Sequence, residues 1–157
     1  MSSRRQKSFG KPRFFAPTHR KLAMRWDGPG ERLKLIDRVL DEIQRDSDDG
    51  VVLVEGRRDE AALSELGVEA EFVRLCGNGR GLVETVERVS RSYDSAVVLT
   101  DWDRQGDRLK DEVKGLLESY GVTPRTVHRK RLRNLTAKDI HDVESLATHR
   151  RNVRREI

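Results

Sequence analysis

The sequence predicts an α/β fold in which a four-stranded, mainly parallel sheet is covered by helices on both faces. Short apolar runs such as "VVLV" (51–54) and "AVVLT" (96–100) alternate with segments of helical periodicity. Runs this short and continuously apolar are typical of strands buried on both sides. The chain of 157 residues is long enough for one domain. Its single cysteine, Cys76, excludes an intrachain disulfide.

The N-terminal part divides into two predicted segments. Residues 1–28 combine Ser, Gly, Pro and basic residues without periodicity, and we expect a flexible basic arm there. Phe14 and Phe15 either stack on exposed bases or pack the arm against the domain. Residues 29–48 follow with apolar side chains at helical spacing, which predicts an amphipathic N-terminal helix.

The predicted domain covers residues 49–149. Its strands are expected at 51–54, 71–77 and 96–100, with amphipathic helices after each of them. The segment "TPRTVHRK" (123–130) predicts a weaker fourth strand at an edge, because Pro124 lacks a ladder donor. The segment "TAKDIHDVESLATHRR" (136–151) predicts a last helix, and residues 150–157 a basic C-terminal tail.

The charge is distributed unevenly. Residues 1–25 carry a net +8 and residues 125–157 a net +6, whereas residues 26–124 carry −9. Basic ends around an acidic centre suggest a bound polyanion and a metal or catalytic site. Solvated charged faces are the alternative. The chain has no long apolar segment and no signal-peptide pattern, so we expect a cytoplasmic protein without a membrane partner.

Acidic residues follow two of the predicted strands. Glu55 comes directly after the first strand, and Asp101 and Asp103 come after the third. Parallel strands end at the same edge, where ligands bind in such folds, so these carboxylates should converge. Mg²⁺ takes oxygen ligands and retains waters, so it would relieve their repulsion. The alternative is that Asp103 or Asp107 only caps the following helix.

The paired motifs resemble the Toprim domain, which is shared by topoisomerases, bacterial-type primases, OLD-type nucleases and RNase M5. The resemblance covers about residues 50–130 and rests on Glu55-Gly56 and on Asp101-Trp102-Asp103. The stretches "EGRRD" and "TDWDRQGDRL" are most similar to the small RNase M5-type branch.

This resemblance implies metal-dependent phosphoryl transfer on nucleic acid. Asp101 and Asp103 would bind Mg²⁺, or Mn²⁺ in its place, and Glu55 would act as general acid/base or as a further ligand. Asp59 and Asp107 would lie in the outer part of the site.

Basic residues are expected to contact phosphates around the site. The candidates are Arg57, Arg58, Arg80, Arg104, Arg129, Lys130 and Arg131. The glycine-rich "CGNGRG" (76–81) either presents N–H groups to a phosphate or forms an ordinary turn. His128 and His149 are expected to face solvent or phosphate. Asp142 or Glu144 is either a late metal ligand or a charge that favours a helix start.

The predicted function is a small Mg²⁺-dependent nuclease that acts on structured RNA or on DNA. The chain shows no gate domain of a topoisomerase and no zinc module of a primase. The alternative is a non-catalytic nucleic-acid or ribonucleoprotein binding module. An acidic pocket of the receiver or dehalogenase type is disfavoured, because the D-x-D follows the third strand and Glu55-Gly56 the first.

Overall fold

The computed structural model describes residues 28–157, so the expected basic arm, but for its last residue, lies outside the described part. The helices are α2 (Pro29–Asp48), α3 (Arg57–Glu65), α4 (Leu82–Ser92), α5 (Arg104–Ser119), α6 (Val127–Thr136) and α7 (Leu146–Arg155). The strands are β1 (Val51–Val54), β2 (Phe72–Arg74), β3 (Ser95–Leu99) and β4 (Thr123–Arg125). No helix within residues 28–157 is long and apolar enough to cross a membrane.

The four strands form one parallel sheet in the order β2-β1-β3-β4, which confirms the predicted fold class. At the centre of the sheet, Val54 is the register partner of Leu99. The carboxyl ends of β1 and β3 therefore meet at the same edge. This register brings the residues that follow the two strands next to each other.

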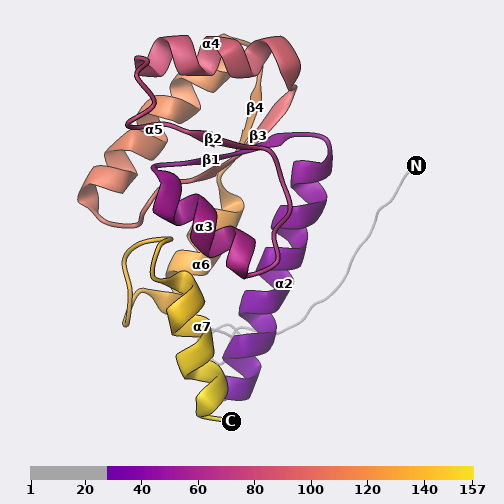
Figure 1. The fold of residues 1–157 in the computed structure, drawn as a ribbon, viewed down its shortest axis with the longest axis vertical. Coiled ribbons are helices and arrows are strands. Elements are labelled where there is room, and N and C mark those ends of the chain that lie inside the picture. The colour runs from indigo at the N-terminus through magenta and orange to yellow at the C-terminus, as the bar shows by residue number, and fades with distance from the viewer. Residues whose placement is uncertain (1–27) are drawn as a thin grey trace, which may run out of the picture.

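Helices cover both faces of the sheet (Figure 1). α4 and α5 lie on one face, and α2, α3, α6 and α7 lie on the other. Val51 and Leu53 of β1 point into the first layer, and Val52 and Val54 point into the second. All four side chains are fully buried, as expected for a central strand of a parallel sheet.

The N-terminal helix α2 belongs to the same hydrophobic core as the sheet. Its residues Ile36, Val39 and Ile43 are fully buried against the face that carries α6 and α7. The predicted amphipathic face is therefore confirmed, and this core links the two ends of the described chain.

The expected fourth strand over 123–130 was wrong beyond Arg125, because residues 127–136 form helix α6. The buried face of α6 consists of His128, Arg129, Leu132, Leu135 and Thr136. These positions have helical spacing, but three of the five side chains are polar. The helical pattern was hidden for that reason.

The last helix also begins later than expected. Residues 137–145 form turns, and α7 starts at Leu146 rather than near residue 136. A local contact stabilises the irregular segment: the Ser145 N–H donates to Asp142 Oδ1 at 2.8 Å. Residues 150–155, which we expected to form a basic tail, continue α7.

Candidate metal and active site

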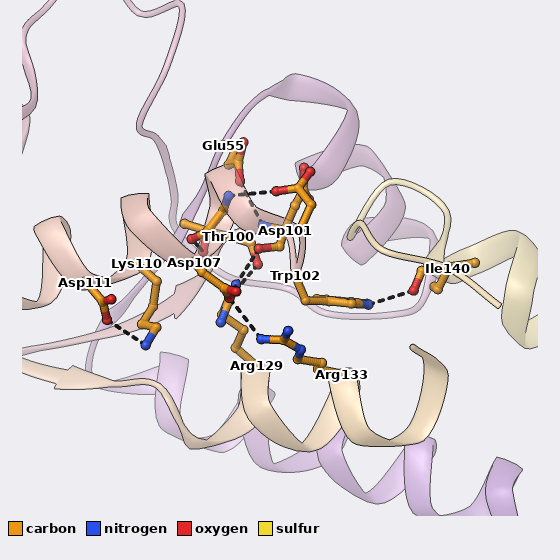
Figure 2. A network of polar contacts seen from close by, with 12 residues as sticks. Glu55, Thr100, Asp101, Trp102, Asp107, Lys110, Asp111, Arg129, Arg133 and Ile140 are labelled. Atoms are coloured by element: carbon orange, nitrogen blue, oxygen red, sulfur yellow. Dashed lines mark hydrogen bonds and ion pairs between the residues drawn. The ribbon is translucent and has the colours of Figure 1, made fainter. Parts of the chain in front are cut away.

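The structure brings Glu55 and Asp101 together, as the sequence predicted. The Asp101 backbone N–H donates to Glu55 Oε2 at 2.8 Å, so the two residues join across the ends of β1 and β3 (Figure 2). Asp101 Oδ1 in turn accepts the backbone N–H of Val143 at 3.0 Å. Main-chain hydrogen bonds therefore hold both carboxyl groups at the sheet edge.

The electrostatics of this pair favour a bound cation. Burial, followed by the charges of Glu55, Asp59 and Asp142, raises the pKa of Asp101 to about 7, although the bond from Val143 opposes the rise. Burial also raises the pKa of Glu55, and the charges of Asp103 and Asp59 add to it. With a pKa of about 7, Asp101 is only partly ionised at neutral pH, and a positive partner would favour its charged form.

Asp103 has a structural role that the sequence left open. It is the N-cap of α5, and its Oδ1 accepts the backbone N–H of Gly106 at 2.7 Å. The side chain is nevertheless exposed and near enough to Glu55 to raise the pKa of that residue. A role of Asp103 as a metal ligand remains a prediction.

Asp59 and Glu144 border the pair on a shared cavity of about 620 Å³, which is also lined by Glu55, Gly56, Arg57, Arg58 and Asp101. Asp59 is 6% exposed, and its Oδ2 accepts the backbone N–H of Gly56 at 3.0 Å. Burial raises its pKa, and the nearby Glu144 and Asp142 charges contribute. Asp59 thus fixes the turn after β1 and also adds negative charge to the cavity.

Asp107 does not line this cavity. Its Oδ1 accepts bonds from Arg129 at 2.7 Å and from Arg133 at 3.0 Å (Figure 2). The Arg129 guanidinium, more than Arg133, lowers the pKa of Asp107. This carboxylate is therefore neutralised within the protein, on the α6 side of the turn.

The basic residues predicted to contact phosphate fall into different environments. Arg57 and Arg58 line the cavity and are exposed, and Arg58 lies 3.4 Å from Glu144. The structure contradicts the prediction for Arg129, which is 4% exposed and bonded within the protein. Among the remaining candidates, Arg104 and Lys130 are exposed. Arg80 lies beside Glu84, and Arg131 is paired with Glu42.

The glycine-rich loop 76–81 is held by one side chain. Asn78 Nδ2 donates to Arg74 O and to Thr85 Oγ1, and Asn78 Oδ1 accepts the Arg80 N–H at 2.8 Å. The Arg80 N–H is therefore used inside the loop. Of the two interpretations, the contacts favour an ordinary turn.

The two C-terminal histidines were wrongly expected to face solvent or phosphate. His128 is 2% exposed and its Nε2 lies 2.6 Å from Asp46. His149 is 5% exposed and its Nε2 lies 3.0 Å from Asp139. Both rings are part of the packing between the C-terminal segment and the rest of the domain.

Residues 140–143 supply groups that support the D-x-D turn, which is Asp101-Trp102-Asp103. The sequence alone did not reveal these groups. Trp102 donates from Nε1 to Ile140 O and from its backbone N–H to His141 O, both at 2.9 Å. Trp102 is 2% exposed. A tryptophan between two aspartates in a surface turn was the available signal, because so large a ring needs a place to pack.

The residues present fit a hydrated divalent cation. Within residues 28–157 no three His, Cys, Asp or Glu side chains are close enough together to enclose a metal ion by themselves. Mg²⁺ does not require such a cage, since it is usually bound by one or two carboxylates and several waters. Glu55 and Asp101 supply oxygen ligands, and a bound cation would oppose the burial and the neighbouring carboxylates that raise their pKa values.

The fold and this acidic edge define a Toprim protein. The Toprim domain family matches residues 50–133, and the chain belongs to that family. The match places the chain in a class with metal-dependent functions related to nucleic acid. The matched segment contains Glu55, Asp101 and Asp103 but ends before Val143.

Within this class the chain belongs to the UPF0292 proteins. It is 38% identical to the UPF0292 protein of Methanosarcina barkeri over 76% of this chain and 82% of that protein. It is 35% identical to the UPF0292 protein of Pyrococcus horikoshii over 74% and 84%. A solved structure of a protein from Aquifex aeolicus superposes with a TM-score of 0.59 at 26% identity, over 69% of this chain and 94% of that one. The predicted membership in the RNase M5-type branch is not confirmed by these relatives.

Proposed function

We propose that this protein is a metal-dependent nuclease that hydrolyses phosphodiester bonds. The observation that carries the proposal is the coupled pair of Glu55 and Asp101 at the carboxyl edge of the parallel sheet. The pair faces a cavity of about 620 Å³ that also presents two arginines. Negative charge for a cation and positive charge for a phosphate thus lie side by side.

Each group of the chain has a proposed role in this chemistry. Mg²⁺, or Mn²⁺, would neutralise charge on the scissile phosphate and orient the attacking water when bound. Asp101 and Glu55 would hold it, with Asp103 as a further ligand. Glu55 would also take or return the proton, since burial raises its pKa. Arg57 and Arg58 would hold the phosphate oxygens.

The proposed substrate is structured RNA, with DNA as the second polymer to test. The similarity of "EGRRD" and "TDWDRQGDRL" to the RNase M5-type branch supports this order. Basic residues at both ends of the sequence would contact the backbone, so binding should weaken steeply as salt rises.

A binding module without catalysis is the second candidate, and it would act on nucleic acid or within a ribonucleoprotein. The observation that favours it is the structural use of two acidic residues, one in the D-x-D turn and one in the first turn of α5. Asp103 caps α5 and Asp107 is paired with Arg129, so neither carboxylate is wholly available for chemistry.

A cleavage assay distinguishes the two candidates. Structured RNA, single-stranded DNA and double-stranded DNA would be incubated with the full chain in Mg²⁺, Mn²⁺ or EDTA. Cleavage that requires metal and is lost in Glu55→Gln and Asp101→Asn, but retained in the exposed control Glu112→Gln, would support the nuclease. Binding without cleavage of any of the three polymers would favour the binding module.

A further inference from the structure

The guanidinium of Arg129 lies beneath residues 100–107, which contain the D-x-D turn, and contacts this segment at three points. Its Nε donates to Thr100 O at 2.9 Å, and its Nη2 donates to Asp101 O and to Asp107 Oδ1 (Figure 2). The side chain is only 5% exposed. A buried arginine with acceptors before, in and after the D-x-D turn restrains the position of that turn, because moving it would leave a buried charge poorly paired.

The turn has little freedom on its other side. Thr100 Oγ1 donates to Gly106 O at 2.8 Å, and Gly106 packs directly against the Asp101 carbonyl, where a Cβ would come within 1.8 Å of Asp101 O. The Asp101 carbonyl is thus held between the Gly106 backbone and the Arg129 guanidinium. Because the carbonyl and the carboxylate share one residue, fixing the first restricts the second.

We propose that Arg129 is a positioning residue that sets the Asp101 carboxylate for metal binding through the main chain of the turn, with Asp107 as its anchor. The proposal rests on the proposed function for its catalytic consequence, but its direct consequence is metal affinity. It replaces the sequence-based prediction that Arg129 contacts phosphate. The two roles predict different effects of a substitution at Arg129. Loss of a positioning residue weakens metal binding, whereas loss of a phosphate contact weakens nucleic-acid binding.

The test uses Arg129→Lys, which keeps the positive charge but cannot reach three acceptors in a fork. Asp107→Asn is the second variant, since it weakens the anchor and leaves Arg129 in place. Arg74→Lys is the matched control. It carries the same substitution, but its guanidinium pairs with Glu60 on α3, away from the turn.

The measurement is Mn²⁺ binding to the full chain without nucleic acid, followed by electron paramagnetic resonance. We expect Arg129→Lys to weaken Mn²⁺ binding by about 10- to 100-fold, the range found when a partner of a ligand is lost. Asp107→Asn should weaken it less, and Arg74→Lys should leave it unchanged. Unchanged Mn²⁺ affinity in Arg129→Lys would overturn the proposal, above all if the salt dependence of RNA binding became shallower.

A second readout is independent of both metal and activity. Hydrogen exchange of the Val143 amide reports the bond to Asp101 Oδ1 directly. We expect this amide to lose protection in Arg129→Lys while amides of β1 keep theirs; equal protection at Val143 would overturn the proposal. If the wild type binds Mn²⁺ but cleaves nothing, the nuclease fails and the positioning role is still decided by these two measurements.

Discussion

Replacing Asp101 by asparagine should stabilise the metal-free protein at neutral pH and abolish its stabilisation by Mg²⁺. The change removes one negative charge beside Glu55, and the remaining Oδ1 can still accept the Val143 N–H. Natural proteins usually lose stability when a partly buried polar residue is altered. A gain would therefore identify Asp101 as a residue that is kept for function at the expense of stability.

The pKa of Asp101 gives the size of the expected gain. Burial and the neighbouring carboxylates raise it from 3.8 to about 7. Each pKa unit corresponds to about 1.4 kcal/mol, so a fully shielded carboxylate would destabilise the fold by about 4 kcal/mol. The side chain is only partly buried, and solvent screening reduces the expected value to about 2 kcal/mol. That corresponds to roughly 4–8 °C in Tm.

The assay is urea unfolding in EDTA between about pH 4 and pH 8. Below the unfolded pKa of 3.8 the carboxyl group is protonated in both states and contributes nothing. Between 3.8 and about 7 the unfolded state loses the proton first, so the wild type becomes steadily less stable than Asp101→Asn. Above about pH 7 the difference should be constant.

The reasoning would be refuted if Asp101→Asn were no more stable than the wild type at pH 8 in EDTA. The control Asp41→Asn removes an exposed carboxylate of α2 outside the site and should change the unfolding free energy by less than about 0.5 kcal/mol. Addition of Mg²⁺ should raise the stability of the wild type and of the control, but not that of Asp101→Asn.

Three further predictions follow from the same turn. Gly106→Ala should lower the free energy of unfolding by more than about 3 kcal/mol, because its Cβ would overlap the Asp101 carbonyl. Gly115→Ala on the same helix meets no atom within 4 Å and should raise the free energy of unfolding by about 1 kcal/mol. Thermal unfolding of both variants checks this. Trp102→Phe should lose about 1 kcal/mol with the bond to Ile140 O, and an unchanged urea midpoint would contradict it. The Mg²⁺ affinity of the wild type should rise by about tenfold per pH unit below the Asp101 pKa of about 7 and then level off, because the cation competes with one proton. Calorimetry at several pH values measures this affinity. A flat profile would argue against Asp101 as a ligand.

The central part of the fold and of the site was predictable because it depends on local patterns. The apolar runs of β1 and β3 marked two buried strands, and parallel pairing of those strands was enough to bring Glu55 to Asp101. No long-range information beyond the βαβ rhythm was needed for that inference. The same reasoning gave α2 its buried face.

The remainder depends on interactions that residue types do not reveal. Helix α6 was missed because Arg129 and His128 occupy buried positions, where Arg129 is hydrogen-bonded to the Asp101 turn and His128 to Asp46. The contribution of Val143 comes from a backbone N–H, which every residue except proline has. Such a donor cannot be recognised without the fold.

The location of Val143 also affects the order in which the site is completed during synthesis. The ribosome makes Glu55 and Asp101, together with the strands that carry them, before it makes Val143. Until that segment emerges, Asp101 Oδ1 lacks the N–H that holds it in the finished protein. A nascent chain that already contains the whole Toprim match would therefore still lack an assembled site.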